Sequence, residues 1–398
     1  MPESVPTALI TEPTVLFALL AAILGSIFWL SKTKFMAGFF KYMPPIIWAY
    51  YIPMILTTMG ITPTASETYA WMTRYLLPVA LFLLMITVDL RAILKLGRIA
   101  IIMMLAGTVG IVIGGPIAYA IFGSFLEPNA WMGFGGLAGS WIGGSVNMIA
   151  VMEGLNAPAD VLGPAIIVDT IVGYGWIGIL LYFSAFQDKF DRWIGADTSV
   201  IEETNRSLEK LDQYRRPLEL EDLTLMVGIS FGVAIIAVLL GDTMPSLGNP
   251  TIISHTTWTV IIVVTIGLAL SFTPLRKMEH AGASKLGYVA LYLLLTGIGA
   301  QADLETILEA PLYLAAGVVW ISIHVGVLVL VARWIKAPLF FVAMGSSANV
   351  GGAVSAPIVA GVYHRAMAPV GLLMAVSGYI LGIYAAVFCA YLLSLMAA

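Results

Sequence analysis

Long apolar runs separated by short polar segments fill most of the chain. A helix that crosses a bilayer needs about 20 mainly apolar residues, and runs near this length are the candidate spans. They are residues 14–31, 44–60, 73–90, 98–123, 131–153, 160–184, 222–241, 256–273, 286–301, 310–333, 338–361 and 367–395. No stretch alternates apolar and polar residues as transmembrane β-strands do. The pattern therefore predicts an all-α polytopic membrane protein.

Composition and charge agree with this pattern and exclude other classes. Hydrophobic residues make up 60% of the chain and charged residues 11%, whereas a soluble domain carries about 25% charged residues. The net charge is −4 and no basic arm is present, which excludes nucleic-acid binding. The single cysteine, Cys389, can form neither an internal disulfide nor a thiolate metal site. The expected surroundings are a lipid bilayer.

Lysines and arginines in short loops predict the orientation, because such loops face the cytoplasm. They follow the first, third, eighth and tenth runs, at Lys32, Lys34, Lys41, Arg91, Lys95, Arg98, Arg276, Lys277, Lys285, Arg333 and Lys336. No basic residue precedes the first run, so we interpret that run as an uncleaved helix.

A polar segment divides the membrane part in two. Residues 185–222 carry both charge signs and contain a helix-like stretch over 198–214, which is typical of a surface linker. We expect a first membrane repeat at 1–184, a cytoplasmic-type linker at 185–222 and a second membrane repeat at 223–398. The loop charges give matching helices opposite orientations, yet an even number of runs separates them. One run therefore does not cross fully, and 222–241 is the first candidate.

Similar strings recur in the same order in the two halves. VALFLL at 79–84 returns as VALYLL at 289–294, and DLRAIL at 89–94 returns as DLETIL at 303–308. Two glycine-rich apolar segments follow, at 133–154 and 343–361. With opposite loop charges around the copies, this order predicts an inverted repeat, which points to a secondary transporter with its site near the bilayer midplane.

Each glycine-rich segment contains a glycine pair, Gly143-Gly144 or Gly351-Gly352, among small polar residues. Glycine lowers helix stability by roughly 1 kcal/mol, so each pair predicts a helix break. The freed N–H groups suit an anion, and the freed carbonyls suit a cation. The alternative is close helix packing on small residues. We expect the solute to contact Gly143, Gly144, Ser145, Ser346, Ser347, Gly351, Gly352 and Ser377.

Asp169 is the one acid deep inside an apolar run. A carboxylate at membrane depth costs about 2.5–3.5 kcal/mol on insertion scales and by default marks an ion or proton pathway. The alternative is a structural carboxylate bonded to a hydroxyl on a neighbouring helix. The predicted ion-binding residues are Asp169, Thr170, Asn147, Asn349 and Ser355.

Three further positions are interpreted as structural. Asp89 and Asp303 stand at helix ends, where an N-cap role is expected. His324 lies in an apolar run, which favours an interhelical hydrogen bond, with a proton-carrier role as the alternative. Glu153 follows the first break and is expected at the membrane surface.

The order of these features resembles the superfamily of cation:proton antiporters and anion transporters, to which bile-acid/sodium symporters belong. Within it, GGLAGSWIGGSVNMIAV and GSSANVGGAVSAPIVAG resemble the uncharacterised membrane family called domain of unknown function 819. The resemblance implies two discontinuous crossing helices, a core domain and a scaffold domain each built from both repeats, and homodimerisation. It departs from the antiporters at Val168, where they often carry a second Asp or an Asn, and at Ser377, where no basic residue stands.

We therefore expect a secondary active transporter in the bacterial inner membrane. It moves a small anionic or zwitterionic solute coupled to sodium or protons. The alternative is a cation/proton antiporter that uses Asp169. An intramembrane enzyme or a channel is less favoured, since the chain has no HExxH string. We expect no catalytic residues, no organic cofactor and no metal beyond sodium at the ion site.

Overall fold

The computed structural model describes residues 8–42, 45–88, 96–199, 201, 217–248, 251–301, 310–364 and 367–397. These residues form helices and no strand, with one isolated bridge between Leu247 and Ile253. Every candidate span overlaps at least one helix. The all-helical fold class predicted from the apolar runs is therefore confirmed.

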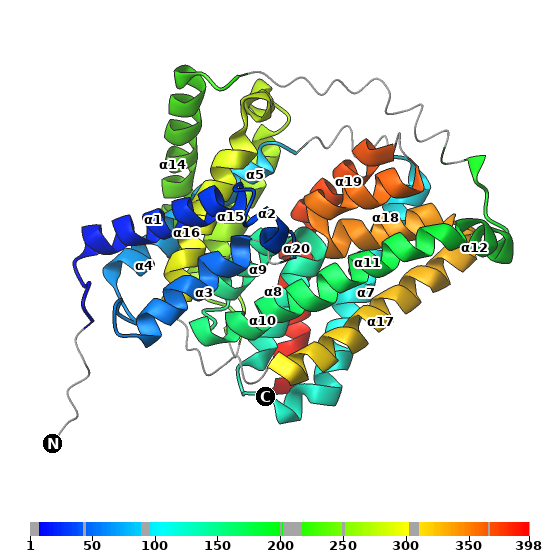
Figure 1. Ribbon diagram of the computed structural model, residues 1–398, viewed down its shortest axis with the longest axis horizontal. Coiled ribbons are helices and arrows are strands. Elements are labelled where there is room, and N and C mark those ends of the chain that lie inside the picture. The colour runs from blue at the N-terminus through cyan, green and yellow to red at the C-terminus, as the bar shows by residue number, and fades with distance from the viewer. Residues whose placement is uncertain are drawn as a thin grey trace.

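The helices gather into two bundles (Figure 1). The first bundle contains α1 (Pro13–Ser31), α3 (Pro45–Thr58), α4 (Glu67–Trp71), α5 (Leu77–Met85), α14 (Leu220–Thr243), α15 (His255–Leu270) and α16 (Ala283–Gly299). The second bundle contains α7 (Arg98–Phe122), α8 (Ala130–Gly143), α9 (Ser145–Gly154), α10 (Leu162–Val168), α11 (Tyr174–Phe183), α12 (Gln187–Ile194), α17 (Ala310–Ile335), α18 (Leu339–Val350), α19 (Gly352–Tyr363) and α20 (Ala368–Ala397). The short α2 (Ala37–Tyr42) follows α1. Each bundle thus takes helices from both sides of the linker.

Contacts between the bundles are concentrated on a few helices. Helices α9 and α20 of the second bundle contact α15 of the first. The hydroxyls of Tyr50 and Tyr51 on α3 donate to the carbonyls of Ala159 and Gly163, at 2.9 and 3.1 Å. The two bundles therefore meet along a seam that contains polar contacts as well as apolar packing.

Among the described residues, seven helices are long and apolar enough to cross a membrane, or eight if the pair α15 and Pro274–Ala281, bent by 97°, counts as one. Helix α14 is one of the seven, with 24 residues. Length and composition therefore do not single out 222–241 as the run that fails to cross. Two further apolar helices are shorter than a full span: α16, with 17 residues, and α18, with 12.

Two helices are interrupted at the predicted glycine pairs. Helix α8 ends at Gly143, and α9 begins after Gly144, whose φ is 83°. Helix α18 ends at Val350, and α19 begins at Gly352, whose φ is 61°. A positive φ is costly for residues with a Cβ and cheap for glycine, which explains why the breaks fall here. The two predicted breaks are confirmed.

Glycines also allow the close packing that was the alternative to a break. A Cβ on Gly378 of α20 would collide with the Ile142 carbonyl, and one on Gly371 would collide with the Ala356 carbonyl. Helix α20 therefore approaches α8 and α19 closely through small residues, as membrane helices often do. The glycine-rich composition therefore serves both purposes: Gly144 and Gly352 break helices, and Gly371 and Gly378 allow close helix packing.

Part of the predicted linker is helical and anchored. Helix α12 lies within 185–222, and the Asp191 carboxylate on it accepts a hydrogen bond from the Leu339 backbone N–H at 2.7 Å, at the start of α18. Most of the predicted stretch 198–214 lies outside the described residues. So do the strings at 89–94 and 303–308, with Asp89 and Asp303.

Candidate functional site at the two helix breaks

The two helix breaks meet at one small cavity. Its volume is about 60 Å³, which is room for one or two water-sized species, since a water occupies about 30 Å³ in the liquid. The lining residues are Ser140, Gly144, Ser145, Asp169, Gly173, Ile177, Val350, Gly351 and Gly352. Both halves of the chain therefore contribute backbone to the same space.

Asp169 supplies the carboxylate of this cavity. It is half-buried and begins a π-helical turn, Asp169–Gly173, between α10 and α11. Such turns occur mostly as single insertions in α-helices, frequently at functional sites. The side chains of Ser140 and Trp141 face the carboxylate. Asp169 Oδ1 and Trp141 Nε1 both lie within 4 Å of the point where a Cβ on Gly173 would stand.

Helix ends add partial charges to this carboxylate. Helices α9 and α19 start at the cavity with N–H groups that lie outside the helical pattern, while α8 and α18 end there with carbonyls. The N–H of Gly144 donates to Ser140 O at 2.7 Å, and that of Gly351 donates to Ser347 O at 2.8 Å. One carboxylate, two serine hydroxyls and nearby carbonyls form an oxygen-rich set of the kind that hard cations prefer. The cavity can therefore hold a small cation or a proton on Asp169.

Five predicted site residues line this cavity. They are Gly144, Ser145, Asp169, Gly351 and Gly352. The other predicted residues do not line it: Gly143, Asn147, Thr170, Ser346, Ser347, Asn349, Ser355 and Ser377.

Asn349 joins two helices. Its Nδ2 donates to Gly345 O at 2.7 Å and to Met104 O at 3.1 Å, and its Oδ1 accepts from Thr108 Oγ1 at 2.9 Å. The side chain is fully buried. Its hydrogen bonds are made within α18 and to α7, so its amide is not directed at the cavity.

Asn147 fills a tight space between α8 and α20. A Cβ on either Gly143 or Gly382 would collide with its Nδ2. The one hydrogen bond that Nδ2 donates is long, 3.5 Å to Tyr379 O, and Oδ1 has no partner among the described residues. Asn147 therefore packs where the interrupted helix meets α20, beside the cavity and not on its wall.

Ser346 belongs to a hydrogen-bonded chain with His324. The His324 Nδ1–H donates to Gly107 O at 2.9 Å, because a carbonyl can only accept. In the neutral ring Nε2, 2.9 Å from Ser346 Oγ, accepts from that hydroxyl, and Ser346 accepts from Trp176 Nε1–H at 2.7 Å. The chain connects α7, α17, α18 and α11. The predicted interhelical hydrogen bond of His324 is confirmed.

The remaining predicted hydroxyls have local partners or neighbours. Ser347 donates to Met344 O at 3.4 Å within its own helix. Ser377 is within hydrogen-bond distance of Met374 O, at 2.6 Å in its own helix, and of Met104 Sδ, at 2.5 Å on α7. Ser355 packs one turn beyond Gly351. Thr170 stands next to Asp169 in the π-helical turn.

The cavity also contains residues that the sequence interpretation did not assign to the site. Gly173 and Ile177 follow Asp169 at intervals of four, and Ser140 precedes Gly144 by four. Residues four apart share a helix face, so this spacing was the available signal. Val350 lines the cavity because it is the last residue of α18, where the second break begins.

The fold and the site define a polytopic α-helical membrane protein in which two interrupted helices and an acidic side chain enclose an ion-sized cavity. The chain belongs to the family described as Protein of unknown function (DUF819), whose model matches residues 18–396. The predicted family resemblance is confirmed at this level. A relative is the Uncharacterized membrane protein YjcL of Bacillus subtilis (strain 168), 23% identical over 347 residues, which cover 84% of this chain and 86% of the relative.

Proposed function

We propose that this protein is a secondary active transporter that couples the movement of a small solute to sodium ions or protons. One observation carries the proposal: Asp169 lies in an ion-sized cavity where two helix breaks meet. Discontinuous helices that meet at a midplane site are the recurrent device of secondary transporters. In this proposal Asp169 binds the coupling cation, with help from Ser140 and Ser145.

The arrangement of the bundles supports a moving core and a stationary scaffold. The second bundle holds both interrupted helices, and the first bundle meets it along a limited seam. We assign the second bundle as the core and the first as the scaffold. Gly144 and Gly352, the second glycines of the two pairs, both have positive φ, in keeping with an inverted repeat. A homodimer formed through the first bundle, in a bacterial inner membrane, remains a prediction from the family resemblance.

Purified protein in proteoliposomes tests the role of Asp169. We expect sodium, or a change in pH, to shift the melting temperature of the wild type and to drive solute uptake. Asp169→Asn removes the negative charge at nearly constant size and should abolish both responses. Glu127→Gln, at an exposed position, is the matched control and should retain them. An Asp169→Asn variant that keeps ion binding and coupled uptake would overturn the proposal.

A cation/proton antiporter is the second candidate, and the size of the cavity favours it. A space of about 60 Å³ admits an ion but not an organic solute. An antiporter would exchange sodium for protons with no solute present. Sodium-driven pH change inside empty proteoliposomes, lost in Asp169→Asn, would establish antiport. Its absence, together with solute-dependent sodium entry, would establish symport.

A further inference from the structure

A second, larger space lies between the two bundles. Its volume is about 600 Å³, within the range of about 300–1,000 Å³ typical of small-molecule sites. We call it the chamber. Its charged and imidazole-bearing lining residues are Arg74, Glu153, Asp242 and His255. Glu153 comes from α9 of the second bundle, and the other three come from the first bundle.

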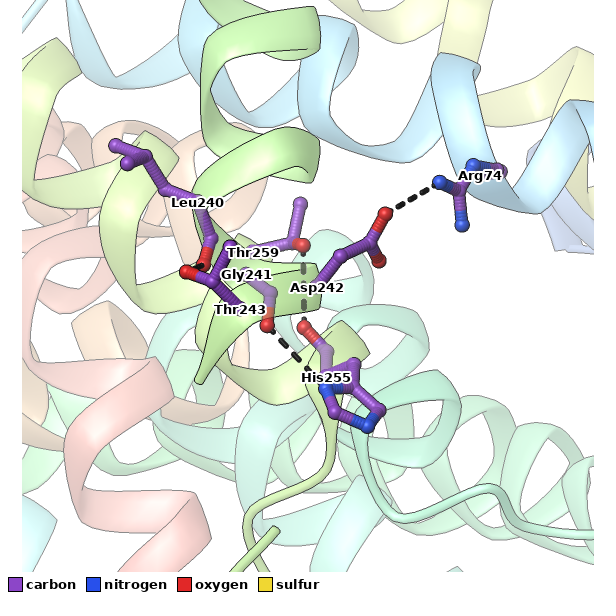
Figure 2. A network of polar contacts seen from close by, with 7 residues as sticks. All are labelled: Arg74, Leu240, Gly241, Asp242, Thr243, His255 and Thr259. Atoms are coloured by element: carbon purple, nitrogen blue, oxygen red, sulfur yellow. Dashed lines mark hydrogen bonds and ion pairs between the residues drawn. The ribbon is translucent and has the colours of Figure 1, made fainter. Parts of the chain in front are cut away.

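One wall of the chamber carries a neutralised charge pair. Arg74 Nη2 donates to Asp242 Oδ2 at 2.6 Å, and Figure 2 shows this contact between the Arg74 helix and α14. Arg74 lies in the π-helical turn Met72–Leu76. The guanidinium and the carboxylate cancel in formal charge, so this wall contributes no net charge to the chamber.

The Glu153 carboxylate on the opposite bundle has no such partner among the described residues. Glu153 lines the chamber and is half-buried, and its side chain makes no hydrogen bond or ion pair within the described part of the chain. Since Arg74 and Asp242 cancel, an ionised Glu153 gives the chamber one uncompensated negative charge. A purely anionic solute would be repelled at this short range, and a cationic group would be attracted.

His255 adds a second acceptor. Its Nδ1–H donates to Gly241 O at 3.3 Å, since the carbonyl can only accept. In the neutral ring Nε2 is then an acceptor, and Figure 2 shows it on the side of the ring away from Gly241. A carboxylate and an imidazole nitrogen are both acceptors for the N–H groups of an ammonium ion.

We propose that the chamber binds a small organic solute with a protonated amine, held by the Glu153 carboxylate. This inference rests on the transporter proposal and narrows its solute class, because it excludes solutes that are only anionic. A carboxylate on the same solute would find the remaining N–H donors of Arg74. The ion occupies the small cavity and the amine occupies the chamber.

Helix α9 connects the two sites. Ser145 at its first position lines the small cavity, and Glu153 near its last lines the chamber. Ten helical residues span about 15 Å. The carbonyl of Gly154 at its end accepts from Ser254 Oγ at 2.5 Å and Thr257 Oγ1 at 2.7 Å, at the start of α15. Ion and solute thus act on opposite ends of one short helix that is anchored to the first bundle.

The experiment uses the full chain in detergent and three four-carbon probes: putrescine, γ-aminobutyrate and succinate. Isothermal titration and thermal shift should show binding of the two amines and none of succinate. Glu153→Gln should weaken amine binding by about tenfold or more, because it removes a charge-assisted contact. Glu127→Gln should leave amine binding unchanged.

Two readouts separate the inference from the transporter proposal. An unchanged ion response in Glu153→Gln shows that the variant is folded, and only Asp169→Asn should lose that response. If Glu153→Gln binds both amines like the wild type, if succinate binds as tightly, or if no probe binds, the chamber assignment is overturned. The transporter proposal stands or falls separately, on Asp169→Asn.

Discussion

Gly144 and Gly352, one in each interrupted helix, both have positive φ and both line the same cavity. A Cβ added at Gly144 would lie 3.6 Å from the Tyr379 side chain, and one added at Gly352 would meet nothing within 4 Å. There is therefore room for a Cβ at both positions, but the positive φ disfavours any residue that has one. Substitutions at these two glycines test the helix breaks without disturbing the packing around them.

Gly144→Ala and Gly352→Ala should each destabilise the protein by about 1–3 kcal/mol, the cost of a backbone conformation with positive φ for a residue with a Cβ. Each should also weaken the ion response. Gly228→Ala on α14, where the added Cβ meets nothing within 4 Å, is the control and should be neutral or slightly stabilising. Chemical or thermal unfolding with and without sodium measures both effects. Equal effects at all three glycines would contradict the assignment.

Asn349 and Asn147 offer a matched pair of equal size. Asn349→Ala removes hydrogen bonds to Met104 and Thr108 on α7 and should cost at least about 1 kcal/mol, given roughly 0.6 kcal/mol per interhelical bond in membranes. Asn147→Ala removes one long hydrogen bond and should cost less. Melting temperatures of the two variants provide the comparison. Neither variant should lose ion binding. If one of them does, that asparagine belongs to the ion site.

Ser346 and Ser347 are neighbours with different partners. Ser346→Ala leaves both His324 Nε2 and Trp176 Nε1 without their shared partner, which should cost about 1–3 kcal/mol. Ser347→Ala removes only a 3.4 Å contact within its own helix and should have little effect. Unfolding of the two variants under identical conditions tests this. Equal stabilities would mean that the His324 chain does not stabilise the fold.

His364 predicts a dependence of stability on pH. Burial lowers the pKa of its imidazole, against the opposing charge of Asp191, and Gln187 Nε2 donates to its Nε2 at 3.3 Å. The unfolded chain then takes up the proton first, so this contribution to stability is full above about pH 6.5 and falls as the pH drops below it. His364→Gln should flatten that decline. If the melting temperature of His364→Gln falls between pH 7 and pH 5 as much as that of the wild type, this prediction is wrong.

The two helix breaks and the position of Asp169 inside an apolar run could be predicted, because each depends only on nearby residues in the chain. A glycine pair weakens a helix wherever it stands, and a carboxylate inside an apolar run is costly in any membrane fold. The roles of Asn147 and Asn349 could not be separated in the same way. Both are amides beside a glycine pair, and only the contacts from α7 and α20 distinguish them.

The chamber had no counterpart in the sequence interpretation. Glu153, expected at the membrane surface, lies near the end of α9 and lines a space that also includes Arg74 and Asp242 from distant segments. Each of these residues looks like an ordinary loop or helix-end charge when read along the chain. Their electrostatic sum exists only where the two bundles meet.

The sequence by itself determined the membrane class, the helices, the two breaks and the family, because hydrophobic length and glycine propensity act over short stretches of chain. Only the tertiary structure decided which polar groups share a space. Hydrogen bonds and charges act over a few ångströms between segments that the sequence separates. That is why Asp169 meets the second break, Asn349 binds α7 and the Glu153 carboxylate faces the chamber with no partner among the described residues.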